Sequence, residues 1–227
     1  MLSAIAIVPC APVLVPELAG AAGAEVAGLT AAVLAAAAEL PPRWIAVGTG
    51  RPAAVVAPDS AGTFAGFGVD VPVRLTPEPG VVRDMPLCAL MAAWVRGQAR
   101  PDGSVEVRVY AGDDDPATSV ARGRRLRAEI EAQPDPIGVL VVADGANTLT
   151  ARAPGGYDPE GAGAQQVLDD ALAGGDLAAL SRLSPRILGR VAFGVLAGLA
   201  EPGPRAAKEL YRGAPYGVGY FAGVWQP

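Results

Sequence analysis

Residues 137–163 form the most informative segment of the chain, IGVLVVADGANTLTARAPGGYDPEGAG. Its apolar first part ends at Asp144, which opens a loop that passes through Tyr157 toward a helical pattern. In α/β proteins, the loops that leave the carboxyl ends of strands form the ligand crevice. We therefore place the candidate site in this loop, where Asp144 is followed by Asn147, the only asparagine of the chain.

On both sides of this segment, short apolar runs alternate with helical patterns. We predict strands at residues 1–8, 43–47, 104–110 and 137–143, and helices at residues 20–40, 84–100, 116–132, 160–173 and 184–199, with a short helix from residue 176. Residues 53–79 are predicted to be irregular with one edge strand, and residues 207–225 to form a closing hairpin. The prediction is one α/β domain over residues 1–227, with a central mostly parallel or mixed sheet, an antiparallel edge and helices on both faces.

The composition excludes several classes of partner. Hydrophobic residues make up 51% and charged residues 18% of the 227 residues, and the formal net charge is -5. These values argue against a disordered chain and against a surface that binds polyanions. We therefore expect no nucleic-acid partner.

The cysteines and the N-terminus indicate a cytoplasmic protein. Two cysteines, Cys10 and Cys88, cannot form a disulfide framework. The apolar N-terminus has no positively charged start and contains Pro9, Pro12 and Pro16, unlike a signal peptide. The apolar run at residues 29–40 has about half the length of a membrane span, so no membrane partner is expected.

Three segments resemble a known family. They are PCAPVLVPE at residues 9–17, DGANTLT followed by APGGYDP at residues 144–159, and PYGVGY at residues 215–220. In this order they resemble the class III extradiol ring-cleavage dioxygenases, a B-subunit-like superfamily that also includes the MEMO-type proteins. Relatives carry Pro-His-Pro-Pro, Asp-Leu-Ser-His-x-Leu-Thr and Pro-Phe-Gly-Val-Gly-Tyr at these places. The segments are spread over the whole chain, and the central one is the most specific.

This chain departs from the family at the residues that do its chemistry. The resemblance implies a ferrous site with two histidines and one carboxylate, and a further histidine for proton transfer. The chain contains no histidine, and Cys10 and Asn147 stand where two family histidines would fall. A third position, Ser-Pro-His in relatives, is Gly48-Thr49-Gly50 here. We therefore predict that Fe(II) and ring cleavage are lost, and that no metal or cofactor is held.

The leading hypothesis is a histidine-less member of this superfamily that keeps its crevice to bind a small molecule or a partner protein. The candidate ligand contacts are Gly48, Thr49, Gly50, Arg51, Thr148, Tyr157 and Glu17. The alternative is an oxidoreductase or hydrolase-like enzyme in the same crevice, with Asp144 as base, Asn147 and Thr148 as hydrogen-bonding groups, and Cys10. A third hypothesis is a homo-oligomer with the apolar tail around Tyr220 and Trp225 as its interface.

Each candidate also has a purely structural interpretation. Asp144 can tie a turn through backbone N–H groups, Asn147 suits a left-handed turn, and Cys10 can be a small buried residue. Tyr157 lies in a Gly-rich loop before a helix start, and Cys88 falls on the apolar face of a helix.

Two further patterns have alternative interpretations. Residues 48–53 fit the dinucleotide fingerprint G-x-G-x-x-G/A with Asp70 downstream, but Pro52 and Pro58 leave little room for the required helix. The acidic run at residues 113–115 suits either Mg²⁺ or the N-terminus of a helix that begins at Pro116.

Overall fold

A seven-stranded mixed sheet runs through the centre of the computed structural model, which describes residues 1–227. Its strand order is β3-β7-β2-β8-β1-β10-β9. The strands are β1 (Leu2–Val8), β2 (Arg43–Gly50), β3 (Ala54–Val56), β7 (Ser104–Ala111), β8 (Ile137–Val142), β9 (Ala206–Gly213) and β10 (Tyr220–Gln226). The four strands β7, β2, β8 and β1 are parallel, whereas β3, β10 and β9 pair antiparallel at the two sides. The predicted mixed sheet is therefore confirmed, with antiparallel strands at both edges.

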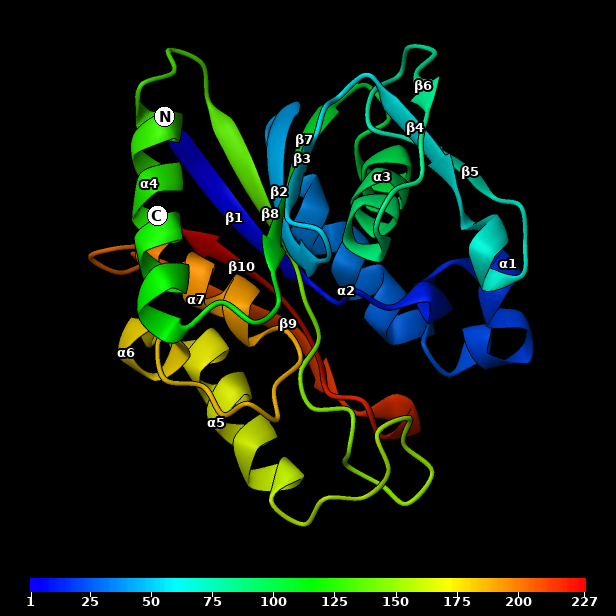
Figure 1. The fold of residues 1–227 in the computed structure, drawn as a ribbon, viewed down its shortest axis with the longest axis vertical. Helices are drawn as coiled ribbons and strands as arrows, with labels where there is room; N and C mark the ends of the chain where they lie inside the picture. Colours follow the sequence, from blue (N-terminus) through cyan, green and yellow to red (C-terminus); the bar gives the residue numbers. More distant parts are fainter.

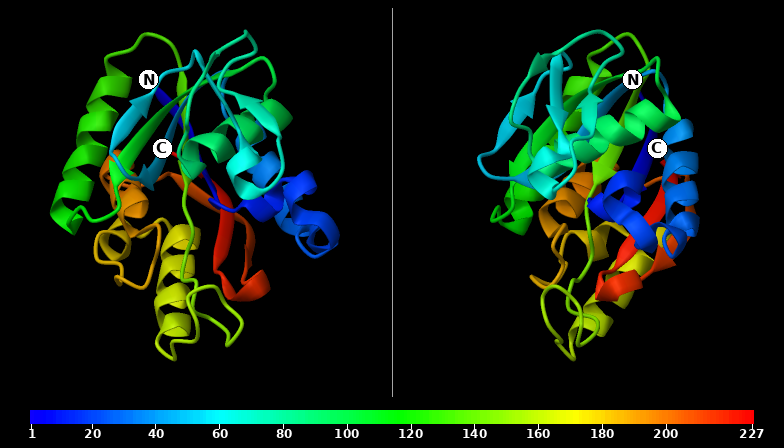
Figure 2. Two further views of the ribbon diagram at one scale, coloured as in Figure 1. Left: turned by 45° about the vertical axis from the view of Figure 1, so that its right-hand side comes forward. Right: turned by 90° about the vertical axis from the view of Figure 1, so that its right-hand side faces the viewer.

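Helices cover both faces of this sheet (Figures 1 and 2). One face carries α2 (Ala27–Ala38) and α3 (Leu87–Ala99). The other carries α4 (Pro116–Glu131), α5 (Gly161–Gly174), α6 (Leu177–Leu180) and α7 (Arg190–Leu199). The central strands are apolar throughout because each alternate residue enters one of two cores: Leu140 of β8 enters the α2–α3 core, and Val141 the opposite core.

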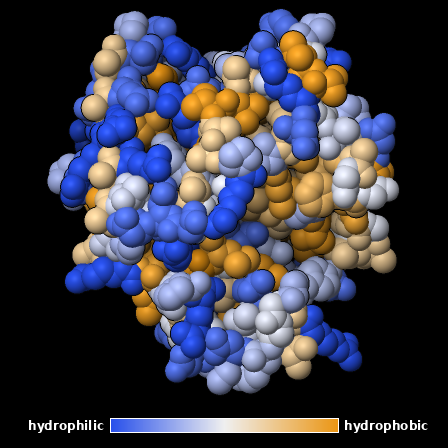
Figure 3. Space-filling model, viewed as in Figure 1, coloured by the Kyte–Doolittle hydropathy of each residue, from blue (hydrophilic) through white to orange (hydrophobic).

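A second, small sheet lies outside α3. It has the order β5-β4-β6 and consists of β4 (Ser60–Thr63), β5 (Pro72–Arg74) and β6 (Val81–Val82). The edge strand predicted within residues 53–79 is confirmed as β3, but the prediction that the rest is irregular was wrong, because β4 and β5 lie there and pair with each other. They are short and interrupted by Pro and Gly, so their sequence lacks alternation. Figure 3 shows apolar surface over β6, where Val82 is 80% exposed.

Helix starts were the least accurate predictions. The helix predicted from Gly20 begins at Ala27, because Gly20 has a φ of 53° and residues 20–24 form the 3-10 turn η2 (Gly20–Ala24). The helix predicted from Asp84 begins at Leu87, after Pro86. The helix predicted from Ser184 begins at Arg190. Residues 184–187 instead form a turn in which the Ile187 N–H donates to the Ser184 carbonyl.

The C-terminal hairpin is confirmed, but its apolar residues belong to the core. Strand β10 lies between β1 and β9, and its alternate residues enter the two cores on opposite faces of the sheet. Tyr220 is buried, and the fully buried Trp225 donates its indole N–H to the Leu172 carbonyl at 2.8 Å. The prediction that Tyr220 and Trp225 form an exposed oligomer interface was therefore wrong. None of the helices has the length and apolar character to cross a membrane.

The remaining connections contain single helical turns. These are η1 (Pro12–Leu14) and α1 (Pro16–Ala19) after β1, η3 (Phe64–Phe67) after β4, and η4 (Pro215–Gly217) before β10. The turns η1 and α1 lead the chain from the end of β1 toward the side of α3 on which the small sheet packs (Figure 1). The turn η4 lies beside the loop that follows β8.

Candidate functional site

The carboxyl ends of β1, β2 and β8 lie at the same end of the sheet, since the three strands are parallel. The chain leaving β1 leads to α2 on one face, whereas the chain leaving β8 leads to α5 on the other. In this class of fold, the place between loops that diverge in this way is the usual one for a ligand. We call the residues gathered here the Asp144 crevice: Cys10, Asp144, Tyr220 and the backbone of residues 145–149 and 217–219.

Asp144 joins the loops after β8 and β1. Its Oδ1 accepts the Cys10 backbone N–H at 2.8 Å, and its carbonyl accepts the Gly189 N–H at 2.8 Å. Burial raises the pKa of the Asp144 carboxyl to about 6, and the hydrogen bond from Cys10 opposes that rise. No basic side chain forms an ion pair with Asp144. Its negative charge is therefore compensated only by a backbone dipole.

The C-terminal PYGVGY segment lies against the loop after β8. The Gly145 N–H donates to the Gly219 carbonyl at 2.9 Å, and the Gly219 N–H donates to the Ala146 carbonyl at 2.8 Å. Further along, the Leu149 N–H donates to the Gly217 carbonyl at 3.1 Å. Three segments that are far apart in the sequence, at residues 9–17, 144–159 and 215–220, are thus joined by hydrogen bonds at one place.

The Gln165 side chain of α5 binds the backbone of this junction. Its side chain is 7% exposed, and Oε1 accepts the Ala146 N–H at 2.8 Å while Nε2 donates to Asp169 Oδ1 at 2.8 Å. A Cβ added at Gly145 or Gly219 would lie 2.0 Å from Oε1, so an alanine at either position would force the Gln165 side chain to move. No sequence pattern indicates this role, because a glutamine in a helical pattern is ordinarily solvent-exposed.

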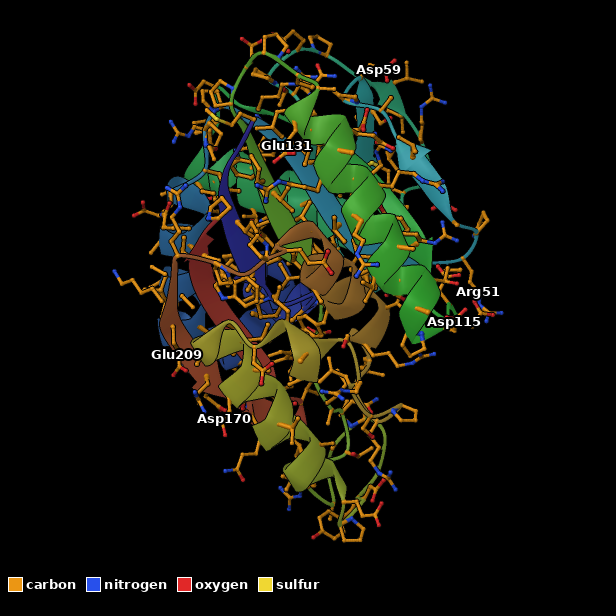
Figure 4. The ribbon with its side chains drawn as sticks, turned by 90° about the vertical axis from the view of Figure 1, so that its left-hand side faces the viewer. Arg51, Asp59, Asp115, Glu131, Asp170 and Glu209 are labelled. Carbon is orange, nitrogen blue, oxygen red and sulfur yellow. The ribbon has the colours of Figure 1, made fainter.

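A pair of ionic contacts fixes α5 beside the hairpin. Arg212 of β9 pairs with Asp170 of α5 at 2.9 Å and with Glu209 of its own strand. Figure 4 shows Asp170 and Glu209 lying close together at this seam. The pKa of the neighbouring Asp169 is raised to about 6, mainly by burial. The helix that supplies Gln165 is therefore held against β9 as well as against the loop.

The Cys10 thiol and the Tyr220 phenol both lie near enough to the Asp144 carboxylate for its charge to affect them. Burial raises the pKa of the Cys10 thiol, and the negative charge of Asp144 raises it further. Tyr220, which was not among the predicted site residues, has its phenol pKa raised by burial and then by Asp144. At neutral pH both groups therefore keep their protons. Cys10 lacks the neighbouring cation that would make it a reactive thiolate.

The predicted ligand loop at residues 48–50 is part of strand β2. Gly48, Thr49 and Gly50 pair in register with β7, so the prediction that β2 ends at Val47 was wrong. Gly48 contacts the buried Cys88 on α3: a Cβ added there would lie 2.4 Å from Cys88 Cβ. The chain continues into β3 and no helix follows, so the dinucleotide fingerprint lacks the element that would bind a pyrophosphate.

Arg51, the next candidate ligand contact, points away from the Asp144 crevice. Its side chain is exposed and pairs with Asp113. The other members of the acidic run are also engaged, since Asp114 pairs with Arg122 and Asp115 caps α4 by accepting the Thr118 N–H at 2.9 Å. The run is thus explained by a helix start and two ion pairs rather than by Mg²⁺.

Asn147 and Thr148 are held within their own loop. The Gly155 N–H donates to the Asn147 carbonyl at 2.9 Å, and a Cβ at Gly155 would lie 2.6 Å from Asn147 Oδ1. The Thr148 hydroxyl is enclosed beside Gly161 without a hydrogen-bond partner. No hydrogen bond joins either side chain to Asp144 or Cys10. Tyr157, near the end of this loop, is 65% exposed.

The larger cavities lie away from the Asp144 crevice. Four of them have volumes of about 540, 550, 420 and 340 Å³, and none is lined by Cys10, Asp144 or Asn147. Arg51 lines the cavity of about 550 Å³ with residues of β3, and Glu17 lines the cavity of about 540 Å³ beside α3. The structure therefore brings Cys10 and Asp144 together but places Arg51 and Glu17 elsewhere.

Comparison with known proteins extends this description to the whole fold. No protein-family model and no curated protein matches the chain. The chain is similar in structure to the uncharacterized protein JW3007 from Escherichia coli K12, with a TM-score of 0.58 and 12% sequence identity, over 99% of this chain and 100% of that one. At this identity the likeness concerns the fold alone.

The residues of the crevice do not fit the ferrous ion that the family resemblance implies. Two imidazoles and a carboxylate would be required, whereas the corresponding positions hold a protonated thiol at Cys10, an amide at Asn147 and one carboxylate at Asp144. No three His, Cys, Asp or Glu side chains are grouped so as to hold a metal ion. The Asp144 carboxylate is instead used to accept the Cys10 N–H.

Proposed function

We propose that this protein is a histidine-less relative of the class III extradiol dioxygenases that retains the crevice for binding and has lost ring cleavage. Its ligand is a small molecule with a hydroxyl or amino donor, held at Asp144. A cytoplasmic location, where both free cysteines stay reduced, is part of the proposal.

One observation supports the proposal above the others. The three segments that resemble the family, which begin at residue 9 and end at residue 220, are joined around Asp144 by hydrogen bonds from Cys10, Gly145 and Gly219. The segments follow β1, follow β8 and precede β10, three neighbouring strands, so the sheet places them at one of its ends. Two glycines at the junction, Gly145 and Gly219, leave room for the Gln165 side chain that binds the loop.

The chemistry of the crevice favours hydrogen-bonded binding. An unpaired carboxylate with a pKa raised to about 6 is a strong acceptor for a ligand hydroxyl or ammonium group. Cys10 and Tyr220, which keep their protons, add weak and strong donors respectively at the same place. A catechol, with two adjacent hydroxyls on a flat ring, satisfies these requirements without any metal.

The enzyme alternative has less support. It needs Asp144, Asn147 and Cys10 to act on one substrate, but the Asn147 side chain is packed over Gly155, and no hydrogen bond joins it to the other two residues. A thiol whose pKa is raised is also a poor nucleophile. The raised pKa of Asp144 remains the observation in its favour, because a base with a pKa near 6 is suited to proton transfer.

The first test separates binding from ring cleavage. Purified protein, with and without added Fe(II), is assayed for iron content and for oxygen uptake with catechol and substituted catechols. We expect no stoichiometric iron and no oxygen uptake above the buffer rate. Stoichiometric iron together with ring cleavage would contradict the proposal.

The second test locates the binding site. Catechol is titrated into the protein under nitrogen by calorimetry, and the titration is repeated with Asp144→Asn and with Asp59→Asn. The control is matched in charge change, since Asp59 is an exposed acid without an ion pair, in the connection between β3 and β4 (Figure 4). We expect Asp144→Asn to weaken binding about tenfold and Asp59→Asn to leave it unchanged. Equal affinity in all three proteins would show that Asp144 does not hold the ligand, and no catechol binding would favour a protein ligand.

A further inference from the structure

A buried arginine without an acidic partner lies on α3, on the side of the helix that faces the small sheet. Arg96 is 6% exposed, and its Nε donates to the Arg74 carbonyl at 3.2 Å while Nη1 donates to the Pro101 carbonyl at 2.7 Å. These bonds leave Nη2 without a hydrogen bond. No carboxylate oxygen lies within 4.0 Å of the Arg96 guanidinium nitrogens, so Arg96 forms no ion pair.

The charge of Arg96 is unusual for its surroundings. Burial lowers the pKa of its guanidinium; the charge of Glu78 raises it, Arg74 lowers it and Asp102 raises it. An arginine remains protonated in spite of such shifts. A buried charge is ordinarily paired, because its removal from water costs several kcal/mol in order of magnitude. The protein itself supplies only two carbonyl dipoles here.

A cavity opens beside this guanidinium. It has a volume of about 540 Å³ and lies between α3, β5 and α1, on the right of the molecule in Figure 1. Its polar lining includes Arg74, Thr76, Arg96 and Gln98, with Glu17 as the only acid. Arg74 is exposed and, like Arg96, forms no ion pair. Two guanidinium groups therefore line one cavity, and neither forms an ion pair within the protein.

The remaining walls are apolar. They are formed by Trp94 of α3, by valines of the small sheet and by prolines from four different segments. Flat aromatic and proline surfaces suit an apolar body, and a volume of this size is typical of small-molecule sites. The planar fork of a guanidinium suits the two oxygens of a carboxylate.

We infer that the cavity beside Arg96 is a binding site for a small organic monocarboxylate, with its carboxylate on Arg96 and Arg74 and its apolar body against Trp94. Glu17 at the rim disfavours a ligand with further negative charge, such as a phosphate ester. The site is separate from the Asp144 crevice, and the inference does not rest on the function proposed for that crevice.

Benzoate is the probe, because it combines one carboxylate with a flat apolar ring. Calorimetric titration is expected to give one site per chain for benzoate and no measurable binding of the neutral analogue benzamide. Inorganic phosphate should bind more weakly than benzoate. Equal binding of benzamide, tighter binding of phosphate, or no binding of benzoate would each overturn the inference.

Matched variants locate the site. Arg74→Ala is expected to weaken benzoate binding about fivefold, while Arg83→Ala, which removes an exposed arginine without an ion pair from the neighbouring 550 Å³ cavity, should leave it unchanged. Neither side chain makes a hydrogen bond within the protein, so both variants should fold normally. If both substitutions weakened benzoate binding equally, the effect would come from the loss of any positive charge, and the inference would be overturned.

Arg96→Lys tests the buried guanidinium itself. It keeps the charge, but a lysine cannot bind two backbone carbonyls and still offer a second planar edge to a ligand. We expect benzoate affinity to fall more than tenfold, with the fold checked by circular dichroism. Asp144→Asn should leave benzoate binding unchanged, and a loss there would assign the ligand to the crevice instead.

Discussion

The Asp144 crevice and the cavity beside Arg96 differ in how they are built and in the charge they leave uncompensated. Backbone groups from three distant segments form the crevice, and its carboxylate has no basic partner. Side chains of α3 and β5 form the cavity, and its guanidinium has no acidic partner. The loop after β1 connects the two regions, since it begins at Cys10 in the crevice and reaches Glu17 at the cavity rim.

This difference explains why only one region was visible in the sequence. A motif records positions where backbone geometry or close packing restricts the residue type, as at Gly217, whose φ is 74°, and at Gly219, which faces Gln165. The cavity depends on an ordinary helical arginine whose burial results from the packing of the small sheet on α3. The crevice can therefore be disturbed through its glycines, and the cavity only through its charges.

The largest expected effect comes from Gly219→Ala. The added Cβ would lie 2.0 Å from Gln165 Oε1, so the side chain must move and the Ala146 N–H loses its acceptor. We expect a loss of about 3 kcal/mol or more in the free energy of unfolding, measured by urea denaturation.

Two further variants test this explanation. Gln165→Ala in the Gly219→Ala background should recover part of the loss, because it removes the clashing atoms. Gly163→Ala, on the open surface of α5, should be neutral or stabilising by up to about 1 kcal/mol. Equal losses from both glycine substitutions would show that the contact with Gln165 is unimportant.

Asp144→Asn is expected to stabilise the protein at pH 7. The folded pKa of about 6 exceeds the ordinary value of 3.8, so the folded state binds a proton more tightly than the unfolded state. Stability contributed by protonation is present below about pH 4 and lost as the pH rises to about 6. The shift of about two units corresponds to at most about 3 kcal/mol.

Urea denaturation between pH 4 and 8 measures this effect. The wild type should lose stability between pH 4 and 6, with Asp169 contributing in the same direction, and Asp144→Asn should lose less. A destabilised Asp144→Asn at pH 7 would mean that an unseen interaction compensates the carboxylate.

The Cys10 thiol provides a smaller effect. Because burial and Asp144 raise its pKa, we expect iodoacetamide at pH 8 to modify Cys10 at least tenfold more slowly than a free thiol. Asp144→Asn should accelerate the reaction severalfold, since the negative charge is removed. Peptide mass spectrometry follows both cysteines, with buried Cys88, whose pKa is about 11, as the internal reference. Unchanged rates in the variant would contradict the electrostatic coupling.

The smallest expected effect is at the rim of the cavity. Glu17→Gln removes the one acid that lines it, and benzoate should then bind about twofold more tightly, because an exposed charge is largely screened. Glu39→Gln, an exposed acid at the end of α2, is the control and should change nothing. Weaker binding in Glu17→Gln would show that Glu17 contacts the ligand.

Much of the fold could be predicted from local patterns. Strands such as β8 are continuous apolar runs, and α4 has Pro116 at its first position with Asp115 as its cap, so both were recognised. Local signals failed where a distant partner decides the structure. Residues 48–50 resemble a glycine loop but pair with β7, and Ser184-Pro185 resembles a helix start but forms a turn.

The sequence by itself determined the α/β class, the strands of the parallel sheet and the absence of any histidine that could bind iron. It also marked Cys10, Asp144 and the PYGVGY segment, because their residue types reflect local backbone requirements. Only the tertiary structure decided that these segments meet, that Gln165 lies between Gly145 and Gly219, and that Trp225 is core. The sequence likewise does not show that Arg96 is buried and has no acidic partner. Burial and charge compensation depend on residues that are distant in the sequence, and no local pattern records them.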